Sequence, residues 1–448
     1  MKRIPTFAAI LLGFSLFIPE PVDAAKSRFS FIRDAEIENT IRVFATPLFR
    51  AAGLEPSAVQ IYLVKDKSLN AFVAGGQKLF LNTGLLMRSE NPGQVIGVIA
   101  HETGHISGGH LSRVHGALEQ STAQSILALV LGGAAAIATG RGDIGQAIAL
   151  GGQQVGLRSF LQYSRTQEAA ADQAAMKILE ATGQSARGLL EFFDILGDQE
   201  LLSVKRQDPY VRTHPLSRER VNAVRAHVDQ SPFGDREWSP AYHMAQARIR
   251  AKLRSFLDPF GHTMRRYPTK DTSLPARYAR AIAYFRKPDL ENGLTRIDAL
   301  IDEHPRDPYF LEVKAQFLFE SGRAAEALPV YQAATDLAPH DSLIRRALAQ
   351  VQLELDDPAL LEPAAKNLRM VLRDEADSPF TWRLLAIAYG RNGQIAESSL
   401  ALAEEAVLKG EKAAATHHAG RAEKLLPRGS SGWLKAQDIL HATKKKDE

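Results

Sequence analysis

Hydrophobic and polar positions follow two periodicities in about the first 265 residues. Residues 59–64 alternate between apolar and polar side chains, which predicts a short β-strand. Residues 71–74 and 78–82 flank a Gly-Gly pair and predict a β-hairpin. Residues 95–110 instead predict a helix, because their apolar side chains recur at helical spacing. We therefore expect the N-terminal part to combine helices with a small amount of β-structure.

The C-terminal part is alanine-rich, has a helical pattern and contains no strand candidate. Pro305 and Pro339 lie 34 residues apart, and each follows an amphipathic segment. Gly322 precedes Pro339 by 17 residues, and Gly410 precedes Pro427 by the same interval. Helix pairs with a small turn residue and a terminal proline at this period are typical of tetratricopeptide repeats. The segments that fit the period, with decreasing regularity, are 306–339, 340–376 and 380–427.

These patterns divide the chain of 448 residues, which is too long for one ordinary core. We expect a first domain over residues 25–265 and a tetratricopeptide-repeat domain over residues 272–448. The boundary is expected in the proline- and glycine-containing stretch 259–275. A non-repetitive helical bundle is the alternative for the second domain. Repeat arrays expose a concave surface that usually binds extended segments of other proteins.

Residues 1–24 predict a cleaved export signal. Lys2 and Arg3 precede a short apolar run, and the tripeptide ending at Ala24 offers small residues for cleavage. An uncleaved N-terminal anchor is the alternative. The sequence contains no cysteine to carry a lipid anchor, so we expect a soluble protein released into a bacterial periplasm.

The amino-acid composition argues against several classes of protein. With 45% hydrophobic and 24% charged residues, the chain is not wholly disordered. A net charge of +4 without a basic block gives little support for nucleic-acid binding. Apolar stretches within residues 125–155 are too short to span a bilayer. They predict either buried, lid-like helices or a flap that makes peripheral contact with membrane or unfolded substrate. Without cysteine, any metal must be held by His, Asp or Glu.

The pentapeptide His101-Glu102-Thr103-Gly104-His105 is an H-E-x-x-H motif in the predicted helix. Residues four apart on a helix differ by about 40° around its axis, so both imidazoles point the same way. They supply two of the three protein ligands of a catalytic zinc site. Glu102 is rotated by about 100° and can reach a water at the metal without binding the metal. Two histidines on an ordinary core helix are the alternative.

A second motif supplies a carboxylate. In the segment 164–172, Glu168 and Asp172 lie one helical turn apart on the same face. Glu168 would complete a two-His, one-Glu site with an open fourth position. Asp172 is placed to accept a hydrogen bond from the far nitrogen of a ligating histidine, fixing its tautomer. Arg165 is expected to steady the carboxylates, or alternatively to form a surface ion pair.

His110 is a rival third ligand. It lies near the last position of the pattern H-E-x-x-H-x-x-G-x-x-H, but Leu111 occupies that position. Nine residues turn a helix by about 900°, which places His110 opposite His101. We therefore expect His110 to be structural or exposed.

The two motifs together resemble those of the HtpX- and Ste-type zinc metallopeptidases, and above all the BepA-like periplasmic proteases with C-terminal tetratricopeptide repeats. The resemblance covers the export signal, Asn70-Ala71-Phe72 at the hairpin, both zinc motifs and the repeats. It implies a mainly α fold. An α-rich, zincin-like protease domain with a small β-sheet would precede an α-helical repeat domain. It also implies that Asn70, Ala71 and Phe72 bind substrate backbone by strand addition.

The resemblance extends to Thr213-His214-Pro215. BepA-like proteins carry a similar Thr-His-Pro, whose histidine can approach the open position of the zinc. His214 is thus implied either to block or tune the metal, or to stabilise the oxyanion when displaced. A turn histidine before proline is the alternative.

We predict an exported zinc metalloendopeptidase with one Zn²⁺ per chain. Its substrates would be misfolded or stalled envelope and outer-membrane proteins, with Glu102 activating a water at the metal. The resemblance implies outer-membrane assembly machinery as a partner of the repeat domain. The alternative is a periplasmic chaperone or assembly adaptor whose proteolysis is latent.

Overall fold

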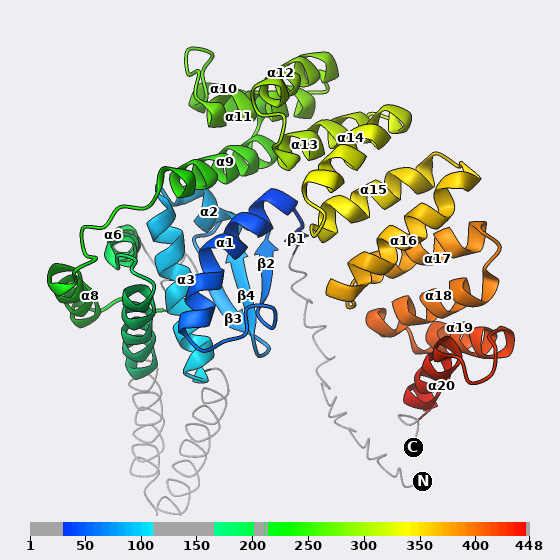
Figure 1. Ribbon diagram of the computed structural model, residues 1–448. Helices are drawn as coiled ribbons and strands as arrows, with labels where there is room; N and C mark the ends of the chain where they lie inside the picture. The colour runs from blue at the N-terminus through cyan, green and yellow to red at the C-terminus, as the bar shows by residue number, and fades with distance from the viewer. Residues whose placement is uncertain (1–29, 111–164, 201–209, 211–213, 445–448) are drawn as a thin grey trace, which may run out of the picture.

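The computed structural model describes residues 30–110, 165–200, 210 and 214–444. The predicted export signal and the apolar stretches within 125–155 lie outside the described residues. Figure 1 shows two parts, a group of helices around a small sheet and a curved row of helix pairs that leads to the C-terminus. This is the mainly α architecture that the sequence predicts. No described helix has both the length and the apolar character needed to cross a membrane.

Four short strands form one mixed sheet in the order β1-β2-β4-β3. β2 runs parallel to β4, whereas β1 pairs antiparallel with β2 and β3 pairs antiparallel with β4. The predicted hairpin is confirmed: β3 and β4 flank Gly75 and Gly76, whose φ angles of 55° and 91° suit a tight turn. Among the strands of the described residues, β3 therefore forms an edge of the sheet. The strands are β1 (Phe31–Ile32), β2 (Gln60–Val64), β3 (Ala71–Ala74) and β4 (Lys78–Asn82).

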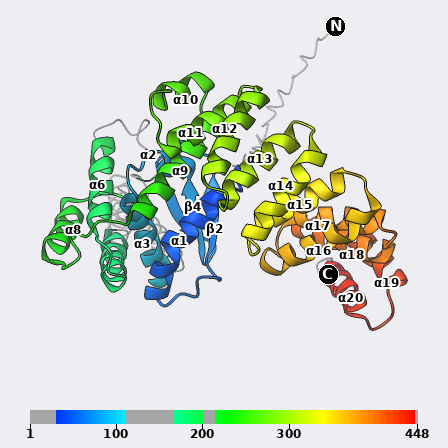
Figure 2. The ribbon, with the colours of Figure 1, turned by 45° about the horizontal axis from the view of Figure 1, so that its top comes forward.

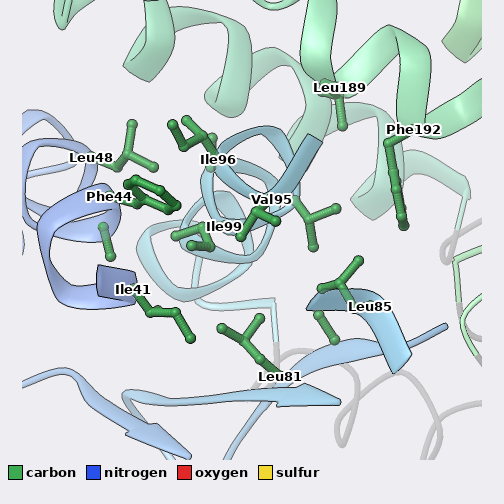
Figure 3. Packing of buried hydrophobic residues seen from close by; sticks show 14 of the residues in the cluster. Ile41, Phe44, Leu48, Leu81, Leu85, Val95, Ile96, Ile99, Leu189 and Phe192 are labelled. Carbon is green, nitrogen blue, oxygen red and sulfur yellow. The ribbon is translucent and has the colours of Figure 1, made fainter. Parts of the chain in front are cut away.

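A buried helix, α3 (Pro92–Ser107), runs through the middle of the first part. Figure 3 shows Val95 and Ile96 packed among apolar side chains of neighbouring elements. At the crossing with α6, Gly97 allows a close approach, since a Cβ there would lie 2.7 Å from the backbone nitrogen of Leu189. This packing fixes the position of the helix that carries the H-E-x-x-H motif. The neighbouring helices are α1 (Ala35–Ala51), α2 (Thr83–Arg88) and α6 (Arg187–Glu200).

The ends of α3 differ from the predicted range 95–110. The helix begins at Pro92, because the side chain of Asn91 caps it by accepting a hydrogen bond from a first-turn N–H. It ends at Ser107, where two glycines follow. The second of them, Gly109, has a φ of 61°, in the left-handed region that favours glycine. The residues after Ser107 therefore leave the helix axis.

From α11 onward, the described chain forms five helix pairs that fit tetratricopeptide-like repeats. The first helices of successive pairs begin 34, 34, 37 and 33 residues apart. Pro305 and Pro339 each lie two residues beyond a helix end, as the period predicts. The array begins one pair earlier than the first predicted segment, and Figure 2 shows it curving away from the sheet. Its helices are α11 (Leu274–Arg286), α12 (Leu290–Glu303), α13 (Pro308–Glu320), α14 (Ala324–Leu337), α15 (Ser342–Glu354), α16 (Pro358–Asp374), α17 (Pro379–Arg391), α18 (Ile395–Lys409), α19 (Lys412–Leu425) and α20 (Ser431–Lys444).

One long helix, α9 (Pro240–Leu257), joins the two parts. It contacts α1, α2 and α3 in the first part and α11 in the array. α8 (Arg218–Gln230) precedes it, and α10 (Phe260–Arg266) lies within the proline- and glycine-containing stretch. The first helices of the array are therefore packed against the N-terminal part.

Candidate metal centre

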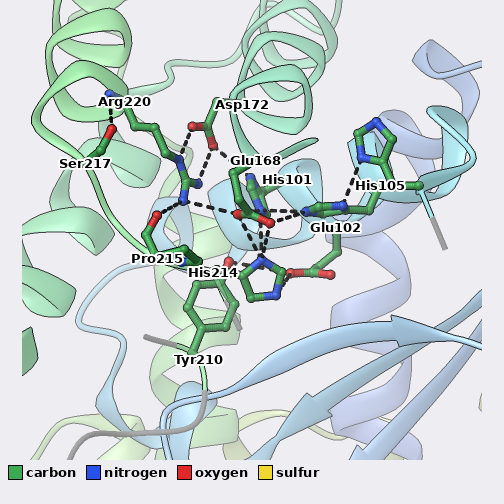
Figure 4. Close-up of polar contacts among 11 residues, drawn as sticks. His101, Glu102, His105, Glu168, Asp172, Tyr210, His214, Pro215, Ser217 and Arg220 are labelled. Carbon is green, nitrogen blue, oxygen red and sulfur yellow. Dashed lines mark hydrogen bonds and ion pairs between the residues drawn. The ribbon is translucent and has the colours of Figure 1, made fainter. Parts of the chain in front are cut away.

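Four buried side chains converge beside α3. His101 and His105 come from α3, Glu168 from a helix over residues 165–181, and His214 from the segment before α8 (Figure 4). One ligand atom of each residue lies within 4.8 Å of the others. The Nε2 atoms of the two α3 histidines are 3.1 Å apart, and each lies 3.4 Å from a Glu168 oxygen. The three ligands predicted from the sequence thus share one site.

Gly104, inside the H-E-x-x-H motif, allows the two ligand-bearing helices to approach closely. A Cβ at Gly104 would lie 2.7 Å from the carbonyl oxygen of Ala171, which belongs to the second motif. A larger residue would therefore push the helices apart. The close contact brings Glu168 within reach of both histidines.

The chemistry of these donors fits zinc. Two imidazole nitrogens and one carboxylate oxygen form a common ligand set of catalytic zinc sites. Glu102 Oε2 lies buried beside the site with no hydrogen-bond partner among the described residues. That oxygen is available for a water or substrate group.

A carboxylate orients the His101 ring from its Nδ1 side, away from the centre. Its Nδ1 lies 2.8 Å from Asp172 Oδ1, and Asp172 in turn receives Arg220 Nε at 2.6 Å. Arg220 also contacts a Glu168 oxygen at 3.1 Å. Arg165, which the sequence suggested for this position, is exposed. The guanidinium beside the carboxylates belongs instead to Arg220, from α8.

His214 contacts the other three side chains of the site. Its Nδ1 lies 3.1 Å from both oxygens of Glu168 and 3.4 Å from His101 Nε2. Its Nε2 lies 3.7 Å from Glu102 Oε1. The ring stacks on Tyr210 with a centroid distance of 4.3 Å, and the Tyr210 hydroxyl is 3.5 Å from Glu102 Oε1. His214 is therefore the fourth side chain of the group that could hold a metal ion.

Burial and nearby charges set the protonation of these groups. Burial opposes ionisation of Glu168, but hydrogen bonds with the three histidines hold its pKa far below the usual range. Burial also disfavours the charged form of His101, yet Asp172 and Glu168 raise its pKa to about 10. Burial lowers the pKa of His105. A metal ligand must present a lone pair, so metal uptake here would release a proton from His101.

His110 lies on the far side of His105 from the centre. It is buried, and its Nδ1 lies 3.0 Å from His105 Nδ1. The expectation that it lies opposite His101 assumed a continuous helix, and the two glycines after Ser107 break that helix.

The residues expected to bind substrate lie at the sheet edge. Ala71 and Phe72 begin the edge strand β3, which contacts α3. Asn70 precedes the strand, and its carbonyl accepts a hydrogen bond from the Asn82 N–H. Phe72 stacks on Phe80 of β4 with a centroid distance of 4.8 Å. Figure 4 shows strands of the sheet passing beneath the site.

The comparisons with known proteins assign a family to the N-terminal part of the chain. Residues 32–228 match the model of peptidase family M48. That range contains all the side chains described at the centre. Together, the fold and the match define an M48 metallopeptidase domain followed by a helical, repeat-like region.

Over most of its length the chain is homologous to beta-barrel assembly-enhancing proteases. It is 24% identical to that of Yersinia pestis over 389 residues, which cover 85% of this chain and 78% of the relative. It is also 24% identical to that of Escherichia coli (strain K12), over 80% of this chain and 72% of the relative. Metalloprotease LoiP of the same organism is 28% identical over 193 residues, covering 43% of this chain and 71% of the relative.

Proposed function

We propose that this protein is an exported zinc endopeptidase that acts on proteins of the bacterial envelope. The observation that carries the proposal is the convergence of His101, His105 and Glu168 beside the buried Glu102. A two-His, one-Glu set leaves a position open for catalysis. Relatives named as beta-barrel assembly-enhancing proteases support outer-membrane proteins as the substrate class.

In this proposal Glu102 is the general base. A bound zinc ion would supply Lewis acidity to the scissile carbonyl and lower the pKa of water. Glu102 then accepts the proton of the attacking water and delivers it to the leaving amine. Its Oε2 has no partner among the described residues, and its Oε1 lies at the edge of hydrogen-bond reach of Tyr210. One oxygen can thus exchange a proton while the other stays oriented.

His214 is proposed as a displaceable fourth ligand. Its Nδ1 approaches Glu168 and the ligand nitrogen of His101, which is where a fourth donor would lie. His101, His105 and Glu168 all lie on helices, whereas His214 and Pro215 lie outside helical structure. Displacement of this segment would open the site to substrate. Stabilisation of the oxyanion by the displaced His214 is the other proposed role.

The edge strand β3 is the proposed substrate-binding element. An extended peptide can add to the end strand of a sheet through main-chain hydrogen bonds. Asn70, Ala71 and Phe72 stand at the start of this strand beside the helix of the metal ligands. Strand addition would suit unfolded outer-membrane proteins, because barrel strands are extended and rich in β-forming residues.

The repeat array is the proposed contact for outer-membrane assembly machinery in the periplasm. To test this, we would truncate the chain after residue 338, which keeps α11 packed on α9, retains α12 to α14 and removes the later pairs. The truncated protein should retain zinc but lose co-purification of assembly factors. Retention of the same partners would show that the later pairs are not the contact.

The decisive experiment for the activity measures zinc content and casein cleavage of the purified full chain. We expect about one zinc per chain and measurable cleavage. Glu102→Gln should keep the zinc and lose the cleavage, because an amide cannot accept the proton. Cleavage by this variant at the parental rate would remove Glu102 from the mechanism. Zinc binding without any cleavage would instead favour a chaperone or adaptor with latent proteolysis. The contact of His214 with Glu168 supports this alternative, because a fourth ligand would block the site.

A further inference from the structure

We infer that His110 is a positioning residue that fixes the orientation and tautomer of the metal ligand His105. The inference rests on the proposed zinc site and adds a residue to it. Its basis is one contact: His110 Nδ1 lies 3.0 Å from His105 Nδ1, and both side chains are buried.

The geometry of His105 assigns the direction of this hydrogen bond. Its Nε2 faces the centre, 3.1 Å from His101 Nε2 and 3.4 Å from Glu168 Oε1. To bind a metal through Nε2, His105 must carry its proton on Nδ1. That proton points at His110 Nδ1, which must therefore accept it. His110 is then neutral with its own proton on Nε2.

The two ligand histidines thus have different supports. His101 donates from Nδ1 to a carboxylate oxygen of Asp172 at 2.8 Å. His105 donates from the equivalent atom to a neutral imidazole. A carboxylate partner increases the basicity of a ligand histidine, whereas a neutral partner fixes orientation without adding negative charge. The site already contains three buried carboxylates, those of Glu102, Glu168 and Asp172.

The sequence Gly108-Gly109 makes this contact sterically possible. Gly109, with a φ of 61°, turns the chain at the end of α3. Gly108 leaves room for the ring, since a Cβ there would lie 2.4 Å from His110 Nε2 and 2.8 Å from its Cδ2. An alanine at position 108 would therefore displace the His110 ring without changing any group of the centre.

The test compares zinc affinity and metal-free stability in the full chain. Zinc dissociation constants would be measured by competition with a chromophoric chelator, and thermal unfolding would be followed in the presence of excess chelator. His110→Leu keeps much of the volume but removes the acceptor, so we expect zinc to bind about 10- to 100-fold more weakly. His110→Asn retains an acceptor near the Nδ1 position and should restore most of the affinity. Gly108→Ala should weaken binding in the same direction as His110→Leu.

His227→Leu is the matched control, because His227 lies on α8 and pairs with Glu180 outside the centre. It should leave zinc affinity unchanged. Equal affinity of His110→Leu and the parent protein would overturn the inference. Two other results would also overturn it. One is a loss of zinc affinity in His110→Asn as large as that in His110→Leu. The other is a loss of zinc affinity in His110→Leu that is accounted for by an equal loss of metal-free stability. Failure of the parent protein to bind zinc would refute the proposed zinc site itself, which is a separate outcome.

Discussion

Arg220 Nε lies 2.6 Å from Asp172 Oδ2, and the same guanidinium donates from a second nitrogen to Oδ1 at 2.9 Å. Both residues are buried, and Asp172 Oδ1 also receives His101 Nδ1. The bidentate pair therefore holds the carboxylate that orients a metal ligand. Burial opposes its charge, but Arg220 and His101 lower the pKa of Asp172 and keep it ionised.

Replacing Arg220 with Met should therefore affect both folding and metal binding. The change removes the buried guanidinium that pairs with Asp172 and Glu168, so the metal-free protein should lose about 3–5 kcal/mol of unfolding free energy. Zinc should bind about 10- to 100-fold more weakly, because His101 loses its fixed support. Denaturant unfolding with chelator and a zinc competition assay measure these effects. Arg218→Met, at an exposed position on the same helix, is the control, and equal behaviour of the two variants would contradict the assigned role.

A second prediction separates the proposed roles of His214. If it is a displaceable ligand, His214→Ala should raise basal casein cleavage and leave the zinc content unchanged, because three protein ligands remain. If it stabilises the oxyanion, the same change should lower the turnover number by about 10²- to 10³-fold. Initial rates at saturating substrate, with metal content measured on the same samples, distinguish the two. An unchanged rate would reject both roles.

Much of the centre can be predicted from short-range sequence pattern. The spacing of His101 and His105 sets both rings on one helix face, and Glu168 and Asp172 repeat that relationship. The hairpin and the 34-residue period depend on local turn chemistry in the same way. These features need no knowledge of the tertiary fold.

The residues that escaped prediction act through tertiary contacts. Arg220 lies 48 residues from Asp172, and no local motif marks it. The position of His110 depends on a turn of the chain at the two glycines after Ser107. A prediction of one continuous helix from 95 to 110 contains no such turn. Lys252 has the pattern of an ordinary charged helix residue, yet it is fully buried. The Gly-Gly pair before His110 is the one signal that could have revealed such a turn.

Lys252 links the metallopeptidase domain to the repeat array, which leads to a third prediction. Its Nζ lies 2.8 Å from Asp34, 3.5 Å from Glu36 and 3.4 Å from Glu312 of α13. Lys252→Met would leave these carboxylates without their shared cation, so we expect a loss of about 3–5 kcal/mol in unfolding free energy. Lys314→Met removes a more exposed pair with Asp298 and should cost less than about 1 kcal/mol. Equal losses in urea unfolding would contradict a structural role for Lys252.

Glu312, one of the carboxylates around Lys252, should make the unfolding free energy depend on pH. Burial raises the pKa of this carboxyl group to about 7, and Lys252 offsets the effect only in part. The folded protein then holds the Glu312 proton more tightly than the unfolded chain does. Its contribution to stability is full below the ordinary value of 4.5 and is lost as the pH rises through about 7.

Glu312→Gln removes this titration while keeping the size of the side chain. The unfolding free energy of the parent protein relative to the variant should therefore fall between about pH 5 and about pH 8. Urea midpoints measured across that range, with chelator present so that the metal centre does not contribute, provide the test. Glu303→Gln is a suitable control, because Glu303 is more exposed and pairs with Arg277 on the surface. A difference between parent and Glu312→Gln that stays constant with pH would show that Glu312 is ionised throughout, and that Lys252 outweighs burial at this position.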